Sequence, residues 1–269
     1  MPRTDADLLR AVRSGDSAAM DEVLARHEKQ VFRFGLRMCG SEEDARDVLQ
    51  ETLIAAFRGL AEFRGDADLS TWLYQIARSF CIKARRRRVD EPSEKVSLDE
   101  PEAQAVAGDA AVPDARVHAR EIGDVLQAAI LSLPEGHREV IVLKDVEGLT
   151  AEEVARVLQE DVAAVKSRLH RARAGLRQAV ATLLGPDGWA GATEPCPELS
   201  EELANYAAGD IDQATCAQIE AHLSQCTRCS GACEALQRTV SLCRRIPGDT
   251  VPTAVRAAVR AALGIGTRR

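Results

Sequence analysis

Aromatic residues are scarce in this chain, and β-branched runs are short. Among 269 residues there are 5 Phe, 2 Trp and 2 Tyr, whereas Ala, Leu, Arg and Glu dominate. This composition favours packed helices over sheets. The length is enough for roughly two domains of ordinary size. We therefore predict an all-α protein.

Long apolar segments are also missing. Nowhere do 18 apolar residues follow one another, and the first ten residues contain no apolar signal-peptide segment. We expect a cytoplasmic protein without a membrane partner.

The chain also lacks a Gly-rich phosphate loop and a plausible pair of nucleophile and base, and its Cys-x-x-Cys at 226–229 is not set in a βαβ unit. We therefore expect no enzyme and assign no catalytic residue.

Positive charge is in deficit overall but locally concentrated. The net charge of −7 argues against a protein that coats nucleic acid indiscriminately. Residues 83–88 hold five basic side chains, residues 166–177 hold five more without an acid, and the stretch between the two is acidic. Contact with DNA would therefore involve two separate patches.

Hydrophobic periodicity, proline and glycine divide the chain into segments. The N-terminal and central segments show helical spacing, and the segment between them is acidic and contains three prolines. Cysteine is concentrated near the C-terminus, where six of the eight lie between Cys196 and Cys243. We predict a helical bundle at 5–88, an acidic flexible linker at 89–119, a helix-turn-helix domain at 120–184, a linker at 185–195, a small helical metal-binding domain at 196–246, and a tail at 247–269 with a short helix at 254–263.

The central domain carries the signals of a helix-turn-helix. Thr150 followed by Glu153 fits a capping box, which predicts a helix from there to about Leu158. A second, strongly basic helix is expected from Val162 to Leu183. It suits a major groove, although a solvated basic face is the alternative. Its candidate DNA-binding residues are Lys166, Ser167, Arg168, His170, Arg171 and Arg173.

Three motifs of this domain resemble region 4 of extracytoplasmic-function (ECF) sigma factors. They are LPEGHREV at 133–140, EGLT at 147–150 and VKSRLHRAR at 165–173. The resemblance implies a domain that reads the −35 promoter element. The family often has Gly where Gln159 stands.

The N-terminal segment resembles region 2 of the same family. DARDVLQET at 44–52 is similar to region 2.2, which implies binding to core RNA polymerase, at the β′ clamp here and the β flap through region 4. FRGDADLSTWLYQIAR at 63–78 is similar to regions 2.3 and 2.4, which melt and read the −10 element. Trp72 is alternatively a core residue. The implied polymerase-binding residues are Asp44, Asp47, Gln50 and Glu51, and the implied DNA-binding residues are Arg64, Trp72, Arg78, Ser79, Lys83, Arg86 and Arg87.

The cysteine-rich segment has the spacing of a metal site. His222, Cys226 and Cys229 lie within eight residues, and a helix places them near one another, so that Cys196 completes a Cys₃His tetrahedron for Zn(II). The pattern resembles the zinc-binding domain of anti-sigma factors.

Three further thiols exceed what one zinc ion uses. Cys216, Cys233 and Cys243 make the tail similar to the cysteine-rich domain of CorE-like sigma factors, which implies sensing of copper, cadmium or zinc by soft thiolates. Packing as small apolar residues is the alternative for Cys216 and Cys243, and it is our expectation for Cys39 and Cys81.

These resemblances together predict a metal-responsive sigma factor controlled in cis by its tail, for which a separate anti-sigma factor is not required. Two alternatives stay open. One is a redox sensor in which Cys226 and Cys229 form a disulfide and release zinc. The other is a helix-turn-helix repressor that binds promoter DNA without polymerase.

Overall fold

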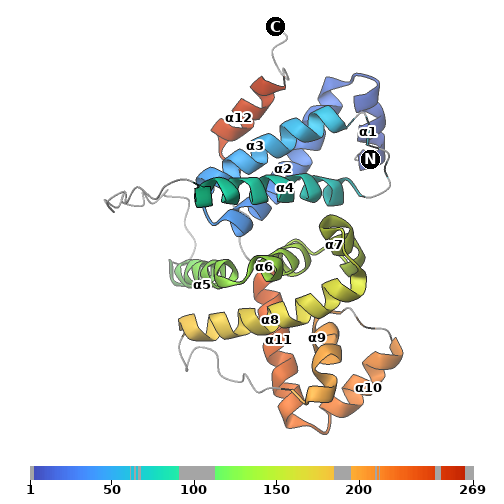
Figure 1. The fold of residues 1–269 in the computed structure, drawn as a ribbon, viewed down its shortest axis with the longest axis vertical. Helices are drawn as coiled ribbons and strands as arrows, with labels where there is room; N and C mark the ends of the chain where they lie inside the picture. Colours follow the sequence, from blue (N-terminus) through green and yellow to red (C-terminus); the bar gives the residue numbers. More distant parts are fainter. Residues whose placement is uncertain are drawn as a thin grey trace.

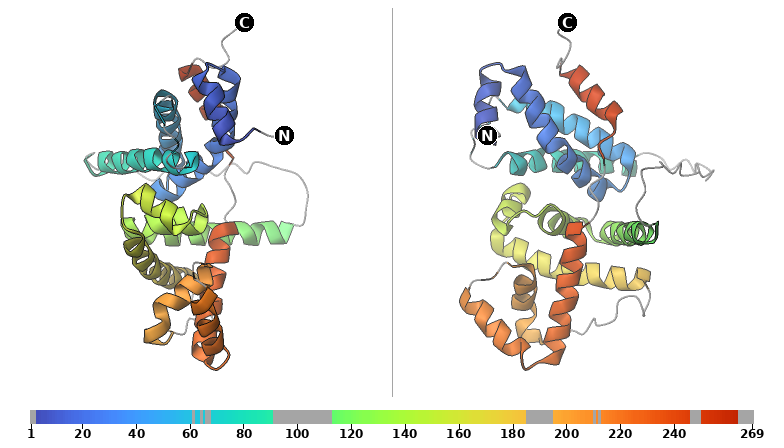
Figure 2. Two further views of the ribbon diagram at one scale, coloured as in Figure 1. Left: turned by 90° about the vertical axis from the view of Figure 1, so that its right-hand side faces the viewer. Right: turned by 180° about the vertical axis from the view of Figure 1, so that it is seen from behind.

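The structure, a computed structural model, describes residues 3–60, 62–63, 65, 68–90, 113–184, 195–209, 211, 213–245 and 250–263. All regular structure in these ranges is helical, and they contain no strand, as the prediction of an all-α protein requires. No described helix is long and apolar enough to cross a membrane. The elements form tiers along the long axis, with the N-terminal helices at one end and the cysteine-rich segment at the other (Figures 1 and 2).

The first tier is a bundle of four helices, α1 (Asp5–Arg13), α2 (Ser17–Cys39), α3 (Glu42–Gly59) and α4 (Leu69–Asp90). Side-chain caps begin the first three: Thr4 forms a capping box with Asp7, the Asp16 carboxylate accepts from Ala18 N and Ala19 N, and Ser41 accepts from Asp44 N. Gly40 ends α2 at φ 77°, a left-handed conformation that glycine adopts without strain.

The second tier contains α5 (Pro113–Ser132), α6 (Glu135–Ile141), a π-helical turn η1 (Val142–Val146), α7 (Ala151–Leu158) and α8 (Val162–Leu184). The predicted capping box starts α7, because Thr150 Oγ1 accepts from Glu153 N at 3.2 Å and Glu153 Oε2 accepts from Thr150 N at 2.6 Å. Two boundaries depart from expectation. Helix α4 ends at Asp90 and helix α5 begins at Pro113, both inside the segment 89–119 that we predicted as linker, and most of that linker lies outside the described residues.

The third tier is the cysteine-rich module, which comprises the 3₁₀ turn η2 (Pro197–Leu199), α9 (Ser200–Ala208), α10 (Gln213–Leu223) and the start of α11 (Thr227–Arg245). It has a small core of its own around Leu203, Ile219 and Ala232. The rest of α11 runs up to η1 and α8 (Figure 1). The last helix, α12 (Thr253–Ala262), lies at the opposite end of the molecule, against α3.

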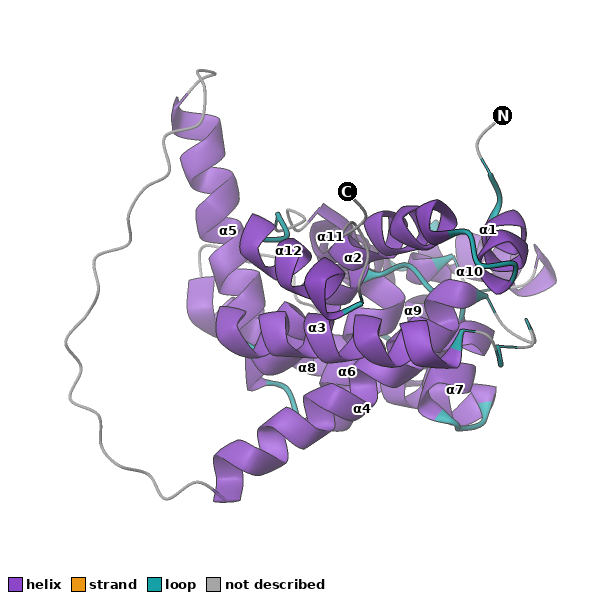
Figure 3. Ribbon diagram, turned by 90° about the horizontal axis from the view of Figure 1, so that it is seen from above, coloured by secondary structure: helices purple, strands orange, loops and turns teal. Residues whose placement is uncertain are grey.

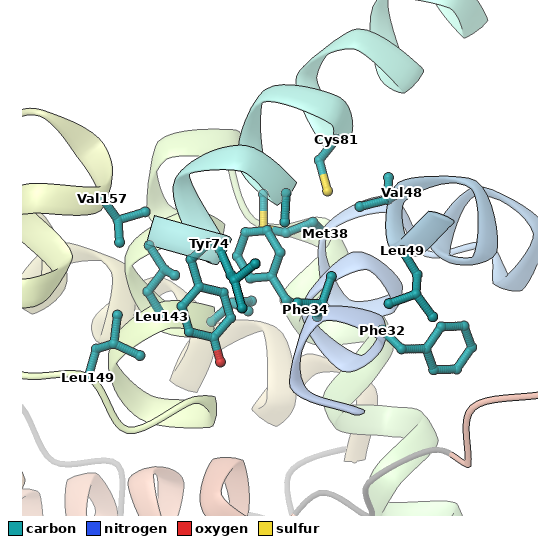
Figure 4. Packing of buried hydrophobic residues seen from close by; sticks show 14 of the residues in the cluster. Phe32, Phe34, Met38, Val48, Leu49, Tyr74, Cys81, Leu143, Leu149 and Val157 are labelled. Carbon is teal, nitrogen blue, oxygen red and sulfur yellow. The ribbon is translucent and has the colours of Figure 1, made fainter. Parts of the chain in front are cut away.

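The first two tiers share one hydrophobic core. Phe34 and Tyr74 have ring centroids 5.4 Å apart and lie in one cluster with Leu143, Leu149 and Val157 of the second tier (Figure 4). The thiols of Cys39 and Cys81 hydrogen-bond each other between α2 and α4, and burial also raises the pKa of Cys81. Figure 3 shows the helices of both tiers overlapping when viewed along the long axis.

A buried polar seam, which we define as Arg33, Tyr74 and Arg78 of the first tier with Glu139 and Glu147 of the second, also joins the tiers. The Glu147 side chain is completely buried and accepts from Arg33 Nε at 2.7 Å and from the Tyr74 hydroxyl at 2.7 Å. Burial and the neighbouring Glu147 raise the pKa of Tyr74, so its hydroxyl keeps the proton that it donates. Arg78 donates to Glu139 from Nε at 2.7 Å.

Candidate functional site

The predicted metal ligands meet at one end of the cysteine-rich module. Cys196 directly precedes η2, His222 lies in the last turn of α10, Cys226 precedes α11, and Cys229 lies in its first turn. Their ligand atoms all lie within 4.8 Å of one another. The prediction of a four-residue Cys and His cluster is thus matched by the structure.

Local backbone hydrogen bonds create this convergence. Cys226 N donates to the His222 carbonyl at 2.9 Å, which brings the two side chains to the same side of the turn between α10 and α11. Cys196 N donates to Cys229 Sγ at 3.2 Å, which holds the distant fourth residue beside the other three.

The cluster fits a zinc ion. Zn–S bonds of about 2.3 Å at tetrahedral angles place two sulfurs about 3.8 Å apart, and Cys196 Sγ lies 4.0 Å from Cys226 Sγ. The Nε2 atom of His222 is buried and has no hydrogen-bond partner in the described part of the chain. An unpaired buried nitrogen is costly unless it binds something. The backbone N–H of Cys229 lowers the pKa of Cys226 to about 7, which favours the thiolate that a metal requires.

The three additional thiols do not form a second cluster. Cys233 is buried in the module core one turn beyond Cys229, and Cys216 is partly exposed on α10, where it contacts the Glu220 carboxylate at 3.6 Å. Cys243 lies far along α11, where its pKa is raised by burial and by the neighbouring Asp145. It is 1% exposed and belongs to the main core. The structure therefore does not bring Cys243 to the other two, and packing is its observed role.

The basic helix α8 has both surface and interior arginines. Lys166, Ser167 and Arg168 are partly exposed and Arg171 is exposed, as a DNA-binding face requires, although Arg168 pairs with Glu160 at 2.6 Å. Arg173 was predicted to bind DNA, and the structure corrects this prediction.

Arg173 is 1% exposed and belongs to an internal ion pair. It donates to both carboxylate oxygens of Asp145, from Nε at 2.9 Å and from Nη2 at 2.6 Å, and its Nη1 donates to the Ala204 carbonyl of α9 at 3.1 Å. The reason is that Asp145 of η1 is buried in the core, where its negative charge needs a buried cation as a partner. Three residues earlier, His170 Nε2 lies 2.9 Å from Ser200 Oγ at the start of α9. The module thus covers one side of α8.

The predicted polymerase-binding residues lie on one groove between α3 and α4. Asp44, Asp47, Gln50 and Glu51 line it from α3, and Lys83 and Arg87 line it from α4. Its volume is about 400 Å³. The structure thus brings acidic side chains predicted to bind polymerase next to basic side chains predicted to bind DNA, which the sequence did not indicate.

The other predicted −10 residues have varied surroundings. Trp72 is partly buried, with its ring 4.9 Å from the ring of Phe63, so it has the packing role that we left open. Arg78 is engaged in the seam with Glu139. Ser79 and Arg86 are exposed, and Arg64 lies outside the described residues.

Sequence reasoning missed the residues that join the tiers. A signal was present for the ion pair inside the second tier, because Lys144 and Asp145 interrupt the apolar run Val140–Val146. Charged residues inside such a run indicate a buried ionic contact. Arg33 and Glu147 carried no comparable signal, since each lies at a position that a surface charge could also occupy.

Three family models match the chain in the order of the tiers. Sigma-70 region 2 matches residues 23–90, Sigma-70 region 4 matches residues 123–176, and a zinc-finger family matches residues 196–230. The first match covers most of α2 and all of α3 and α4, the second covers α6, α7 and the first two thirds of α8, and the third contains all four clustered ligands. We refer below to α1–α4 as region 2 and to α5–α8 as region 4.

Curated relatives agree with these matches. The RNA polymerase sigma-H factor of Pseudomonas aeruginosa is 34% identical over 188 residues, which cover 67% of this chain and 95% of that protein. The ECF sigma factor SigM of Mycobacterium tuberculosis is 34% identical over 183 residues, which cover 68% and 86%. A solved structure of CnrH in complex with the cytosolic domain of CnrY is 27% identical, with a TM-score of 0.48, and covers 65% and 96%. The chain therefore belongs to the ECF family of sigma-70 RNA polymerase sigma factors.

Proposed function

We propose that this sigma factor is controlled in cis by its cysteine-rich module, which binds zinc and responds to a soft metal ion. Sigma factors bind core RNA polymerase and promoter DNA. Core would be bound at the β′ clamp through Asp44, Asp47, Gln50 and Glu51, and at the β flap through region 4. The observation that carries the proposal is the contact of α9 with α8, where Arg173 donates to the Ala204 carbonyl and His170 contacts Ser200.

Regions 2 and 4 contact each other directly, and this closed arrangement supports control of initiation by their separation. The −10 and −35 elements are separated by about 25 base pairs, or roughly 85 Å at 3.4 Å per pair. In the structure, region 2 contacts region 4 directly through the polar seam and the shared core. One molecule cannot read both elements in this arrangement, so initiation requires the two regions to separate.

The metal would act by holding the helices of the module in place. Cys196, His222, Cys226 and Cys229 would hold Zn(II), which supplies a tetrahedral centre that links η2, α10 and α11. Because α9 lies between this centre and α8, a change in the bound metal would alter the contacts of α9 with Arg173 and His170. Soft thiolates accept Cu(I) and Cd(II) as well as Zn(II), so copper, cadmium or zinc homeostasis genes are the proposed targets.

A redox response is the second candidate, and the position of the Cys226 and Cys229 sulfurs within 4.8 Å of each other favours it. A thiolate at Cys226 would attack hydrogen peroxide, and Cys229 would displace water from the resulting sulfenic acid, so that two thiols and one peroxide yield one disulfide and two waters. The family assignment leaves no support for a repressor that works without polymerase.

In vitro transcription with core polymerase tests both candidates. We expect initiation to require this protein and its output to change with one of Zn(II), Cd(II) or Cu(I), but not with peroxide. Cys226→Ser should abolish the metal response, whereas Gln218→Ala, at an exposed position of α10 on the same module, should retain it. A response to peroxide alone would favour the redox candidate, and an output that ignores both would contradict control by the module.

A further inference from the structure

Helix α12 has two pairs of residues at helical spacing. Val255 and Val259 are four residues apart and therefore share one face, and Arg256 and Arg260 form a parallel pair one position further on. Both valines are buried, with 7% and 2% of their surface exposed. The alanines on the other side, including Ala257 and Ala258, are exposed. The helix is thus amphipathic, and its apolar face is covered.

Region 2 supplies the matching surface, a docking groove that we define as Asp21, Leu24 and Glu28 of α2 with Leu49 and Leu53 of α3. The three leucines are buried beneath α12. Arg256 Nε donates to Glu28 Oε2 at 3.0 Å, while Arg260 donates to both oxygens of Asp21 at 2.8 and 3.1 Å. The acids thus occur in the reverse order of the arginines, so α12 runs antiparallel to α2.

We propose that this groove is a helix-docking site for α12 of the same chain, and that α12 must leave it before region 2 and region 4 can separate. The docking stands on its own contacts, whereas its regulatory role rests on the proposed function. The pairing of two arginines with two carboxylates across an apolar strip gives the site its specificity for a basic amphipathic helix.

The covalent connection between α11 and α12 sets the limit on separation. Arg245 ends α11 and Thr253 begins α12, so eight residue steps span at most about 28 Å when fully extended. Helix α11 packs against η1 and α8 of region 4, and α12 packs against α3 of region 2. With both helices docked, the end of α11 and the start of α12 stay within about 28 Å of each other, whereas the two promoter elements lie roughly 85 Å apart.

Helix α12 is the end that would detach. It contributes two buried valines and two ion pairs whose arginines, Arg256 and Arg260, are 33% and 42% exposed, although the Glu28 side chain is 7% exposed. Helix α11, in contrast, buries Ala235, Leu236, Val240 and Cys243. Partly exposed ion pairs are weak and are readily replaced by water. The groove also lies on α3, whose other flank carries the predicted polymerase-binding residues.

Charge reversal of the full-length chain tests the docking. In Arg256→Glu/Arg260→Glu, carboxylates would face Glu28 and Asp21, so we expect amide hydrogen exchange in α12 to become fast while α2 to α8 stay protected. Adding Asp21→Arg and Glu28→Arg should restore slow exchange. Arg238→Glu, at an exposed arginine of α11, is the matched control and should leave α12 protected.

The same variants test the consequence for polymerase. If undocking precedes binding, the core concentration for half-maximal transcription should fall about tenfold in the reversed variant and return in the restored one, because the apparent affinity scales with the competent fraction. Fast exchange of α12 in the parent protein would overturn the docking, and protection that grows with protein concentration would assign the groove to a second copy. If α12 exchanges slowly in the parent protein but the reversed variant needs the same core concentration as the parent, only the regulatory role of the docking would be overturned. None of these readouts requires a metal response, so they remain separate from the test of the module.

Discussion

At the scale of single residues, the backbone at Gln159 is the clearest case of local strain. It is the only described non-glycine residue with a positive φ, at 58°, and its side chain is exposed. It ends α7 in the left-handed conformation that glycine usually supplies at helix ends. This explains in physical terms why glycine suits this position in the turn of the helix-turn-helix.

Gln159→Gly should therefore stabilise region 4. Relief of left-handed strain gains about 1–2 kcal/mol, and the added freedom of the unfolded chain offsets about 0.5–1 of it, which leaves roughly 0.5 kcal/mol. Chemical denaturation measures this difference. Gly148→Ala is the opposite control, because Gly148 has φ 78° with open space around its Cβ position, and it should be destabilising. Equal effects of both substitutions would contradict the argument.

At the scale of elements, the pairing of α8 with η1 depends on one buried ion pair. The side chains of Arg173 and Asp145 are 1% and 2% exposed. Removing one partner of such a pair leaves an uncompensated buried charge, whereas replacing both with apolar residues of similar size is often nearly neutral.

Arg173→Met should thus lower the free energy of unfolding by about 3–5 kcal/mol. The double variant Arg173→Met/Asp145→Leu should recover most of that loss. Arg171→Met, at an exposed arginine two residues away, should change stability by less than about 0.5 kcal/mol and act on promoter binding instead. Thermal unfolding and a promoter-binding assay separate these effects. A folded, fully stable Arg173→Met that binds DNA weakly would restore Arg173 to the DNA-binding surface.

These elements also indicate what sequence could predict. The start of α7 at Thr150, the extent of α8 and the ligands His222, Cys226 and Cys229 followed from local spacing, because caps and these three side chains act within a few residues. The fourth ligand, Cys196, lies 26 residues before His222 and completed a pattern known from anti-sigma factors. The π-helical turn at Val142–Val146 did not, and the partner of its Asp145 is Arg173, 28 residues further along the chain. The docking of α12 likewise depends on Asp21 and Glu28, more than 220 residues earlier.

At the scale of the whole molecule, Glu147 holds region 2 against region 4. Its buried carboxylate accepts from Arg33 and Tyr74, both in region 2, so its removal leaves two donors without their acceptor. We expect Glu147→Ala to weaken the closed arrangement by about 2–4 kcal/mol. Because α12 must also leave its groove before the regions separate, small-angle X-ray scattering should show a larger radius of gyration when Glu147→Ala is added to the Arg256→Glu/Arg260→Glu variant. Glu152→Ala in the same background, at an exposed acid on α7, is the control. An unchanged radius would mean that the shared apolar core and the Arg78–Glu139 pair keep the regions together.

The position of α12 in the chain has a consequence for newly made protein. Regions 2 and 4 are complete at Leu184, whereas α12 ends at Ala262, 78 residues later. At 5–20 residues per second, ribosomes need roughly 4–16 s to make that difference. During this interval each nascent chain has both sigma regions but no helix for the docking groove. Such chains would be held closed only by the polar seam and the shared core. A burst of synthesis would therefore deliver a brief pulse of protein in which the two regions separate more readily than in the finished molecule.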